Sequence, residues 1–552
     1  MSKKKTNTTN HKTISTTQLG KKIESIVVNI ICLLVFAAFG YIAVMSIIQT
    51  SKIDPANYSS EVILYETDNI ALNILFTSLF FVFLFAMKKR YNFFEKVNMK
   101  YLEIALPVYV VALGFVWVLS AQSVPAADSQ NIFEAAANAV NGNYSSMYDG
   151  GDFYNKDFYS GFSYFSFYPF QLGFVFICEI VYRIFGTSSA MPIEIINVFC
   201  VALAYLAIAK ISRMIFKKRS IEFFAILLLA GCFQPILFCT FAYGNIIGMC
   251  CGLWASYYLI KYFQTSKYVL LIPCAVLITL STLAKYNNMI YVVAFVIMLI
   301  IHTVKQKKWQ SVAFALAVCI LSVGVSQLVI ISYEARANTT LKSGVSQTLY
   351  LDMGLNESYM APGWYNNIAK DTFINNGLDN ERANKAAMTD IQNRMKYSFS
   401  DIDYSVDFFG KKILSQWNEP TFESIWVSEV KAHYTELNGL ANGMYEGSTG
   451  QFFELYFNWY IQILYILFAA GLYCMFLNKK NNIETVLLPL IILGGFGYHL
   501  LFEGKSQYIL TYIPLIIPVA SYAVSCILDG QYTKIKQIVG KLKHIPETEK
   551  QK

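Results

Sequence analysis

Long apolar stretches recur along this chain, and they constrain its fold more than any other feature. A helix of ~20 apolar residues crosses the ~30 Å hydrocarbon core of a bilayer at ~1.5 Å per residue. We place about twelve such spans at 26–48, 70–87, 102–121, 191–213, 221–240, 245–262, 268–284, 287–303, 311–333, 456–477, 484–501 and 506–527. Charged residues make up only 14% of the sequence, against about 25% in soluble domains. The sequence therefore predicts an all-α polytopic membrane protein.

The cysteines agree with this assignment. All 11 lie within apolar segments, from Cys32 to Cys526, and the long polar segment 334–455 has none. A disulfide framework is therefore not indicated. These observations argue against a soluble enzyme, a disordered protein and a secreted disulfide scaffold.

The basic residues show how the chain is oriented. The net charge is +8, and much of it is clustered between spans, as the positive-inside rule predicts for cytoplasmic connectors. The clusters are Lys3–Lys5, Lys21-Lys22, Lys88–Arg90, Lys217–Arg219, Lys305–Lys308, Lys479-Lys480 and Lys534–Lys543. Both termini are thus predicted to be cytoplasmic, and this charge pattern points to a membrane surface and not to nucleic acid.

One further apolar segment, 170–186, needs a separate decision. If it crossed the membrane, Lys217–Arg219 would lie outside, against the charge rule. It also contains Glu179 and Arg183, which are four residues apart on one helical face and can pair. We therefore predict that 170–186 lies along the outer interface or re-enters, and does not cross.

Two polar segments are too long to be simple connectors, and long ordered loops are often functional. The first, 122–190, is predicted to hold interfacial helices, one of them ending at Gly142. The second, 334–455, is predicted to form a small extracytoplasmic cap domain of α or α+β type. The resulting order is a basic N-terminus (1–25), three helices (26–121), the first outer loop (122–190), helices four to nine (191–333), the cap (334–455), three helices (456–527) and a basic tail (528–552).

This topology gathers polar residues on the outer side of the membrane. Ionisable groups near spans are costly and are functional candidates by default. Separate segments bring them to one face, including Asp128, Glu134, Tyr243–Asn245, Lys285–Asn288, Glu334, Arg336, His499, Glu503, Lys505 and Tyr508. The convergence of these segments predicts a site on the outer face.

Each candidate also has a simpler explanation. Asp128 can cap a helix over 129–141, and Lys285 can extend its ammonium from a span end. The Tyr-rich run 154–168 can be an interfacial aromatic belt. His499 and Glu503 are four apart, and a structural hydrogen bond is favoured over metal ligation, which needs more ligands.

Several short motifs occur in an order found in a known superfamily. An early Asp and a helix ending in Gly come first (Asp128 to Gly142), followed by Tyr-Pro-x-Gln (Tyr168 to Gln171), Ala284-Lys285-Tyr286-Asn287, and a late Glu503, Tyr508 and Pro514 after a large outer loop. Over most of residues 100–525 the sequence resembles the GT-C glycosyltransferases, in particular the bacterial mannosyltransferase-like and aminoarabinose-transferase-like members. The resemblance implies a polyprenyl-phosphate-linked sugar donor, no nucleotide sugar, and inversion at the anomeric carbon.

The resemblance also implies roles for individual residues. Asp128 would be the general base that deprotonates the acceptor hydroxyl. Lys285, helped by Arg336 or Lys505, would hold the lipid phosphate in a low-dielectric pocket. Further substrate-binding candidates are Glu134, Tyr164, Tyr168, Gln171, Asn245, Trp364, Glu503 and Tyr508, of which the aromatic ones can stack on sugar rings. Some superfamily members bind a divalent metal, but the sequence has no ligand cluster that identifies a metal site.

The sequence departs from the family pattern in two places. Two spans precede the one that leads into the Asp128 loop, whereas the Asp commonly follows the first span. The Arg that usually stands just before the late Tyr is replaced by Gln507, so Lys505 would have to bind phosphate as a point charge without bidentate geometry.

Three other functions are compatible with a protein of this kind. A flippase or transporter usually has ionisable sites near mid-membrane, and the spans here are nearly free of charge. An O-antigen-type polymerase or ligase depends on outer-loop arginines, and 334–455 contains Arg336, Arg382 and Arg394. A membrane scaffold would not need the polar outer face.

Richness in Lys, Asn, Ile and Tyr suggests the plasma membrane of an AT-rich bacterium, with a cell-envelope polysaccharide, teichoic acid, lipid or protein as acceptor.

Overall fold

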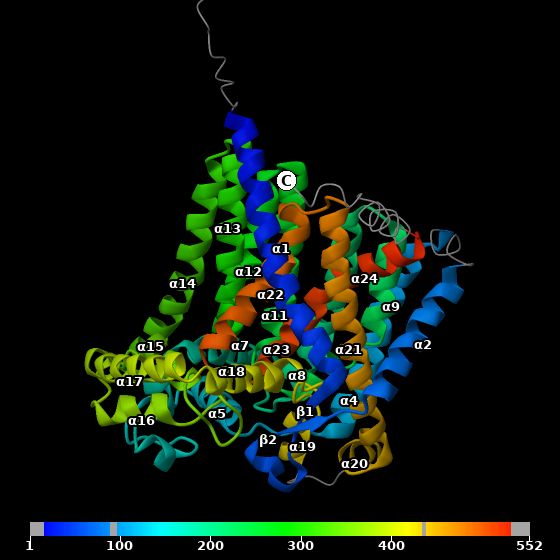
Figure 1. Cartoon of the computed structure of the whole chain (residues 1–552). Helices are drawn as coiled ribbons and strands as arrows, with labels where there is room; N and C mark the ends of the chain where they lie inside the picture. Colours follow the sequence, from blue (N-terminus) through cyan, green and yellow to red (C-terminus); the bar gives the residue numbers. More distant parts are fainter. Residues whose placement is uncertain (1–15, 89–95, 433–437, 531–552) are drawn as a thin grey trace, which may run out of the picture.

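The computed structural model describes residues 16–88, 96–432 and 438–530, and within them most residues lie in helices. Ten helices are long and apolar enough to cross a membrane, or up to 12 if each of two bent pairs is one span. The long helices are α1 (Thr16–Ile48), α2 (Ile70–Lys88), α4 (Met99–Ala121), α8 (Met191–Phe216), α11 (Asn245–Thr265), α13 (Met289–Gln306), α14 (Gln310–Ala337), α21 (Ser448–Leu477), α22 (Ile483–Leu501) and α24 (Ile513–Leu528) (Figure 1). The predicted all-α polytopic fold is confirmed. The predicted basic clusters at Lys3–Lys5 and Lys534–Lys543, and Lys89-Arg90, lie outside the described residues.

Two of the predicted spans are less regular than the sequence suggested. The span expected over 221–240 is broken into α9 (Arg219–Ala230) and a short segment over Gln234–Thr240, which meet at a bend of 48°. The break falls between Ala230 and Gln234, and Pro235, in the first turn of the second piece, has no amide proton to donate. The span expected over 268–284 is a shorter apolar helix, a 3-10 turn over Tyr268–Leu270 followed by α12 (Leu271–Ala284).

Helices α4 and α8 run antiparallel, and this settles the path of the first polar loop. Glu103 near the start of α4 pairs with Lys210 near the end of α8, while Gly114 further along α4 packs on Val198 near the start of α8. Helix α8 therefore begins at the end of the bundle where α4 stops. Helix α7 (Leu172–Phe185), which lies between them in the chain, does not carry it to the opposite end, as predicted for 170–186.

A β-hairpin between α1 and α2 was not predicted. Strands β1 (Gln49–Ile53) and β2 (Ile63–Thr67) are antiparallel, with Gln49 opposite Thr67 and Ile53 opposite Ile63. The connection begins with a turn in which Asp54 accepts a hydrogen bond from the Ala56 amide, and it continues as a 3-10 helix over Pro55–Ser60. The strands are short and partly polar, so their alternation is weak in the sequence.

The second polar segment contains six described helices. They are α15 (Gln347–Gly354), α16 (Ile368–Asn375), α17 (Asn380–Ser400), α18 (Ile402–Trp417), α19 (Trp426–Ala432) and α20 (Gly439–Tyr445). Helices α15–α17 share a buried cluster with α5 (Asp128–Val140) and α7, whereas Trp417 and Phe422 belong to the core of the spanning bundle. The segment is thus divided between two packing environments, and no strand occurs in its described part.

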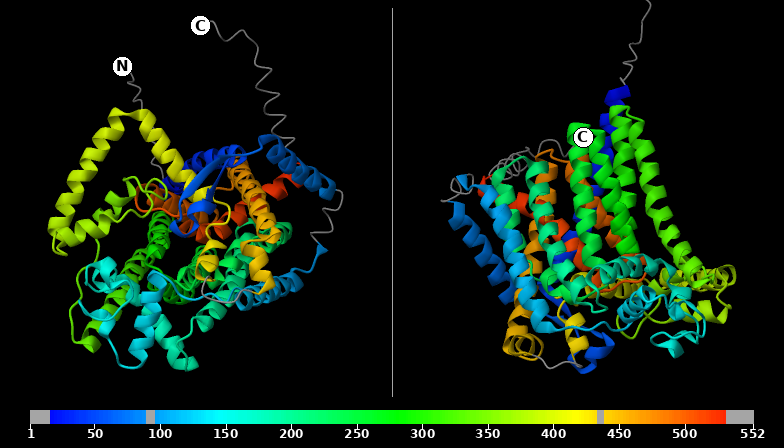
Figure 2. Two further views of the ribbon diagram at one scale, coloured as in Figure 1. Left: turned by 90° about the horizontal axis from the view of Figure 1, so that it is seen from below. Right: turned by 180° about the vertical axis from the view of Figure 1, so that it is seen from behind.

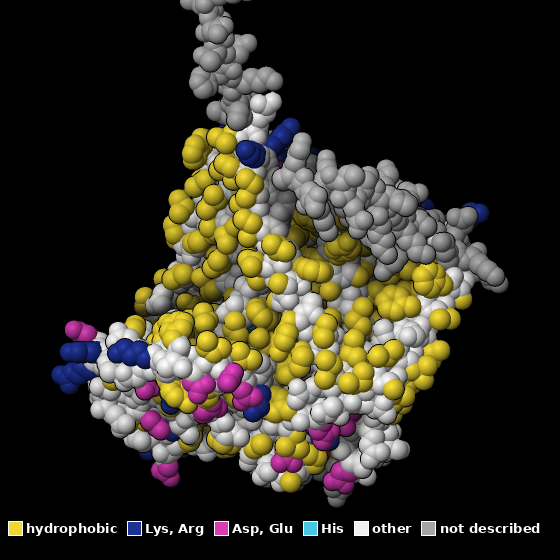
Figure 3. Space-filling view, in the orientation of Figure 1, with side chains coloured by type: hydrophobic (Ala, Val, Ile, Leu, Met, Phe, Trp, Pro, Cys, Tyr) yellow, Lys and Arg dark blue, Asp and Glu magenta, His cyan; other side chains and the backbone are white. Residues whose placement is uncertain are grey.

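The polar layer lies at one end of the bundle. The hairpin, α5, α7 and α15–α20 lie at the lower end in Figure 1, and the view from below in Figure 2 shows them surrounding the helix ends. The space-filling view shows a broad hydrophobic belt over the spanning helices, with most acidic side chains below it (Figure 3). The fold therefore brings loops that are far apart in sequence to one face.

Candidate active site

A cavity of about 480 Å³ lies at this polar end of the bundle. Its walls come from the hairpin, the start of α5, the turn before α7, the connections before α11 and α13, helix α15, and the segment between α22 and α24. The predicted site residues that line it are Asp128, Tyr168, Gln171, Lys285, Glu503, Lys505 and Tyr508. Widely separated segments thus supply both acids and cations to one space.

Asp128 is the first residue of α5, and its side chain does not cap that helix. The preceding Ala127 has φ 49° and ψ −129°, a backbone conformation that costs a non-glycine residue energy. Ser129 instead engages the turn, accepting from the Ala126 amide and donating to the Ala126 carbonyl oxygen. The simpler explanation of Asp128 as an N-cap is therefore wrong, and its carboxylate is left to face the cavity. The helix ends near Gly142, which has φ 72°.

Tyr243 connects the acid to the nearest cation. Its hydroxyl donates to Asp128 Oδ2 at 3.1 Å and accepts a hydrogen bond from Gln171. The Lys285 ammonium lies over the Tyr243 ring, 3.8 Å from its centroid, a cation–π distance. One tyrosine thus orients the carboxylate with its hydroxyl and supports the ammonium with its ring.

The ionisation of these two groups is set mainly by burial. Burial raises the pKa of Asp128, and the Tyr243 hydrogen bond and the Lys285 charge only partly oppose it. Lys285 lies in the turn between α12 and α13, where burial lowers its pKa to about 8, against the attraction of Asp128 and Glu503. The carboxylate is therefore more basic than an exposed aspartate, and the ammonium is poised to lose its proton just above neutral pH.

Lys505 is the second cation and is held by carboxylates from distant segments. It forms an ion pair with Glu61 of the hairpin, and both side chains are buried. Glu423, fully buried, accepts hydrogen bonds from Ser506 and Gln507 at the adjacent backbone turn. The charges of Glu61 and Glu423 outweigh burial and raise the pKa of Lys505, which therefore stays charged.

Backbone strain accompanies these acids. Glu61, Ala127 and Glu423 all have positive φ values, of 54°, 49° and 58°. Such conformations are uncommon in residues other than glycine and persist where the surrounding structure enforces them. Glu61 and Ala127 line the cavity, and Glu423 binds the turn that carries Lys505, so the strained residues gather at one site, as is common at functional sites.

Glu503 and Tyr508 complete the wall opposite Asp128. The Tyr508 hydroxyl donates to Glu503 Oε1 at 3.2 Å, and burial raises the pKa of Glu503. His499 Nδ1 lies 3.1 Å from the backbone oxygen of Glu503, so its contact is structural and not with the carboxylate. Asn245 lines a small adjoining cavity that also touches Lys285 and Tyr508.

Several predicted residues lie outside the main cavity. Glu134 accepts a hydrogen bond from Gln130 at 2.7 Å. Tyr164 is fully buried and packs against Tyr168 with ring centroids 5.1 Å apart. Trp364 is also fully buried, and its ring lies 5.8 Å from the Lys505 ammonium. Tyr164 and Trp364 therefore support cavity residues from behind and have no exposed face on which a sugar could stack.

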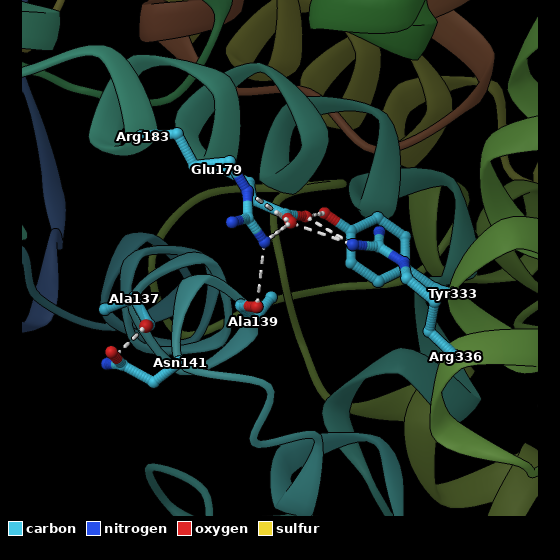
Figure 4. A network of polar contacts seen from close by, with 7 residues as sticks. All are labelled: Ala137, Ala139, Asn141, Glu179, Arg183, Tyr333 and Arg336. Atoms are coloured by element: carbon cyan, nitrogen blue, oxygen red, sulfur yellow. Dashed lines mark hydrogen bonds and ion pairs between the residues drawn. The ribbon is translucent and has the colours of Figure 1, made fainter.

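Arg336 is not brought into the cavity. Its guanidinium pairs with Glu179 of α7 at 2.8 Å, and Glu179 also accepts from Tyr333 and Arg183 (Figure 4). This cluster joins α14 to α7, and Arg183 reaches the Ala139 carbonyl oxygen at the end of α5. The donor-phosphate role predicted for Arg336 is not supported, because Arg336 does not line the cavity and its guanidinium is held by Glu179. The predicted pairing of Glu179 with Arg183 is present.

Sequence reasoning missed part of the cavity wall. Glu61 was not considered, and neither were the aromatic lining residues Tyr350, Tyr365 and Trp426. Glu423, which is fully buried behind the wall and binds Ser506 and Gln507, was not considered either. The only sequence feature that pointed to the aromatic lining residues is the aromatic content of the chain, 16%. Glu61 and Glu423 stand in polar loops with no motif around them, so no local signal marks them.

The acids around the cavity do not fit a divalent metal. In the described part of the chain, no three His, Cys, Asp or Glu side chains are grouped so that they could hold one. Glu61 forms an ion pair with Lys505, and Glu423 interacts with the same ammonium. The positive charge of Lys505 therefore compensates the carboxylates in place of a metal ion.

The cavity residues can be compared with those of known proteins. The family described as dolichyl-phosphate-mannose-protein mannosyltransferase matches residues 171–330. The resemblance to the GT-C superfamily is confirmed. The matched part of the chain contains Gln171, Tyr243 and Lys285, whereas Asp128, Glu503 and Lys505 lie outside it. The chain is a membrane protein with a glycosyltransferase family signature.

Solved structures with a similar course of the chain are distant in sequence. The archaeal oligosaccharyltransferase AglB from Archaeoglobus fulgidus, in complex with an inhibitory peptide and a dolichol-phosphate, is 14% identical with a TM-score of 0.39. The match covers 80% of this chain but 52% of AglB, so this chain spans about half the length of AglB. ArnT from Cupriavidus metallidurans, bound to undecaprenyl phosphate, is 11% identical with a TM-score of 0.33, and 78% of each chain is covered. No curated protein is significantly similar in sequence.

Proposed function

We propose that this chain transfers a sugar from a polyprenyl-phosphate donor to a cell-envelope acceptor on the outer face of a bacterial plasma membrane. The observation that carries the proposal is the shared cavity of Asp128 and Lys285, joined through Tyr243. An acid beside a cation at the end of a membrane bundle suits a lipid-phosphate substrate whose sugar must meet a second substrate at the membrane surface.

The acceptor side of the reaction rests on Asp128. Its carboxylate takes the proton of an acceptor hydroxyl as the hydroxyl oxygen attacks the anomeric carbon of the donor sugar. The Tyr243 hydroxyl holds the carboxylate in place through Oδ2. The raised pKa of Asp128 makes it a stronger base than an exposed aspartate.

The donor side rests on the two lysines. The bond between the anomeric carbon and the phosphate oxygen breaks as the new bond forms, which inverts the configuration, and polyprenyl phosphate leaves with an added negative charge. Lys285 and Lys505 stabilise that charge in a site shielded from water, where electrostatic stabilisation is strong. Tyr168, Tyr350 and Tyr365 line the same cavity and offer surfaces for sugar rings.

The proposal is tested by reconstituting the full chain in proteoliposomes with a radiolabelled polyprenyl-phosphate sugar and an isolated envelope glycan. Transfer of label that requires Asp128 is expected. Envelope glycan composition should also be compared in cells with and without the gene. Loss of one sugar substituent supports the transferase, while shortened chains would indicate a polymerase and intracellular build-up of lipid-linked sugar a flippase.

A further inference from the structure

Helices α17 and α18 project sideways from the bundle as an elbow whose apex lies near residues 399–402. In Figure 1 α18 lies next to the lower end of α1 and α17 lies further to the left, and the view from below in Figure 2 shows them as a V that extends beyond the bundle. Large apolar side chains are exposed at the apex and along α18: Phe399 is 79% exposed, Ile402 71% and Val406 69%. Such exposure in a folded chain marks a surface with a partner.

The exposed apolar residues of α18 form a stripe. Ile402 and Val406 are exposed and four residues apart, and the half-buried Gly410 and Ile413 continue the same helical face toward the bundle. Asp403, Asp407 and Lys411 are exposed and lie on another face of the same helix. Helix α18 is therefore amphipathic along its length, as helices that lie in a membrane interface are.

At Gly410 the stripe reaches a membrane-spanning helix. A Cβ atom at Gly410 would lie 3.7 Å from the Tyr41 hydroxyl of α1. Tyr41 is itself 41% exposed and stands seven residues before the end of α1 at Ile48, ~10 Å along that helix. This is the depth at which interfacial helices bury their apolar face, ~5–10 Å into the headgroup boundary.

The surface around the elbow agrees with this placement. In Figure 3 hydrophobic side chains lie above α18 and continue into the belt over the spanning helices, while acidic side chains gather along its lower edge. The apolar stripe is thus continuous with surface that faces lipid.

We propose that the α17–α18 elbow is an in-plane membrane anchor whose apex and α18 stripe insert into the outer leaflet of the bilayer that the bundle spans. The partner is the phospholipid surface itself. Because α17 contributes Ala383 and Ala387 to the buried cluster shared with α5 and α7, the anchor ties the cavity side of the protein to the membrane surface.

The test places single cysteines in the full chain, in nanodiscs of phosphatidylethanolamine and phosphatidylglycerol. I402C and V406C lie on the stripe, and D403C and D407C are matched exposed controls on the same helix. The native cysteines are buried or half-buried in the structure, and the parent chain gives the background labelling. An impermeant charged maleimide should label the stripe positions at least ten-fold more slowly than the controls.

A second measurement identifies what covers the stripe. A bimane fluorophore at 402 or 406 should be quenched by lipids brominated just below the headgroup, and one at 403 or 407 should not. Fast maleimide labelling at all four positions would overturn the proposal, because the elbow would then lie in water. Slow labelling without quenching would also overturn it, since a protein surface such as a second copy would then cover the stripe.

Discussion

Asp128 and Lys285 both contact the side chain of Tyr243. The Tyr243 hydroxyl donates a hydrogen bond to the Asp128 carboxylate, and the Lys285 ammonium lies 3.8 Å from the centroid of the Tyr243 ring. The proposed base and the proposed phosphate-binding cation are therefore held in fixed relation without a direct ion pair between them. A direct pair would have to break before either group could serve a substrate.

The first prediction concerns the base. Asp128→Asn should lower transfer by about 10²–10⁴-fold, because an amide cannot accept the acceptor proton, while the thermal unfolding temperature stays near that of the parent chain. Glu134→Gln is the matched control, since Glu134 lies outside the cavity on the same helix and should keep activity. Near-full transfer by Asp128→Asn would remove Asp128 from the base role.

A second prediction concerns pH. Activity needs Asp128 deprotonated and Lys285 protonated, so kcat/KM should rise on the acid side and fall on the alkaline side. Burial raises the pKa of Asp128, which moves the acid limb above that of an exposed aspartate, and the alkaline limb should lie near the Lys285 pKa of about 8. Lys285→Arg keeps its charge, so its alkaline limb should shift to higher pH; an unchanged limb would assign that titration to another group.

A third prediction separates donor from acceptor. Lys285→Ala should raise the KM for the lipid-phosphate donor and lower kcat, with little effect on the acceptor KM, because the lost charge faces the phosphate. Arg336→Ala is the contrasting variant: its guanidinium is bound to Glu179, so it should alter stability and leave the donor KM unchanged. Equal donor KM values for Lys285→Ala and the parent would contradict the assignment.

The fourth prediction concerns the buried pair of Glu61 and Lys505. Glu61→Gln should destabilise the chain by about 3 kcal/mol, at the low end for a broken buried pair, because Glu423 still faces Lys505. The double variant Glu61→Gln with Lys505→Met should recover part of that loss. Glu66→Gln is the control in the same hairpin, since its pair with Lys52 is half exposed and such pairs contribute about 0–1 kcal/mol. Thermal unfolding in detergent measures all three.

A fifth prediction concerns the cluster in Figure 4. Glu179→Gln removes the carboxylate that accepts from Arg336, Arg183 and Tyr333. The chain should unfold at a lower temperature because two guanidinium groups lose their counter-charge, but activity per folded molecule should be retained. A selective loss of donor binding with unchanged stability would return this cluster to the site.

The sequence predicted the spanning helices because each is marked by its own apolar run, as at 26–48 and 191–213. It also placed Asp128, Lys285, Glu503 and Lys505 on one face, since topology alone decides which loops meet. It could not predict the break before Pro235, because an apolar run does not show where a helix bends. Arg336 was misplaced for a similar reason: its partner Glu179 is 157 residues away, and a charge in a loop gives no sign that it is already paired.

No local sequence pattern could have predicted that Glu61 lines the cavity. Its hairpin has weak alternation, and its partner Lys505 lies 444 residues further along the chain. Glu423 is likewise defined by a positive φ that no motif announces. What sequence reasoning lacked was the packing of the first loop against the last.

That separation has a consequence for biosynthesis. Glu61 leaves the ribosome early, and its counter-charge arrives only with the loop before the final helix, so a nascent chain must carry an unmatched carboxylate through nearly the whole of translation. Assembly of the cavity is thus a closing event that waits for the C-terminal helices, and chains that stop short of Lys505 should be recognised as unfinished by the quality-control proteases of the membrane.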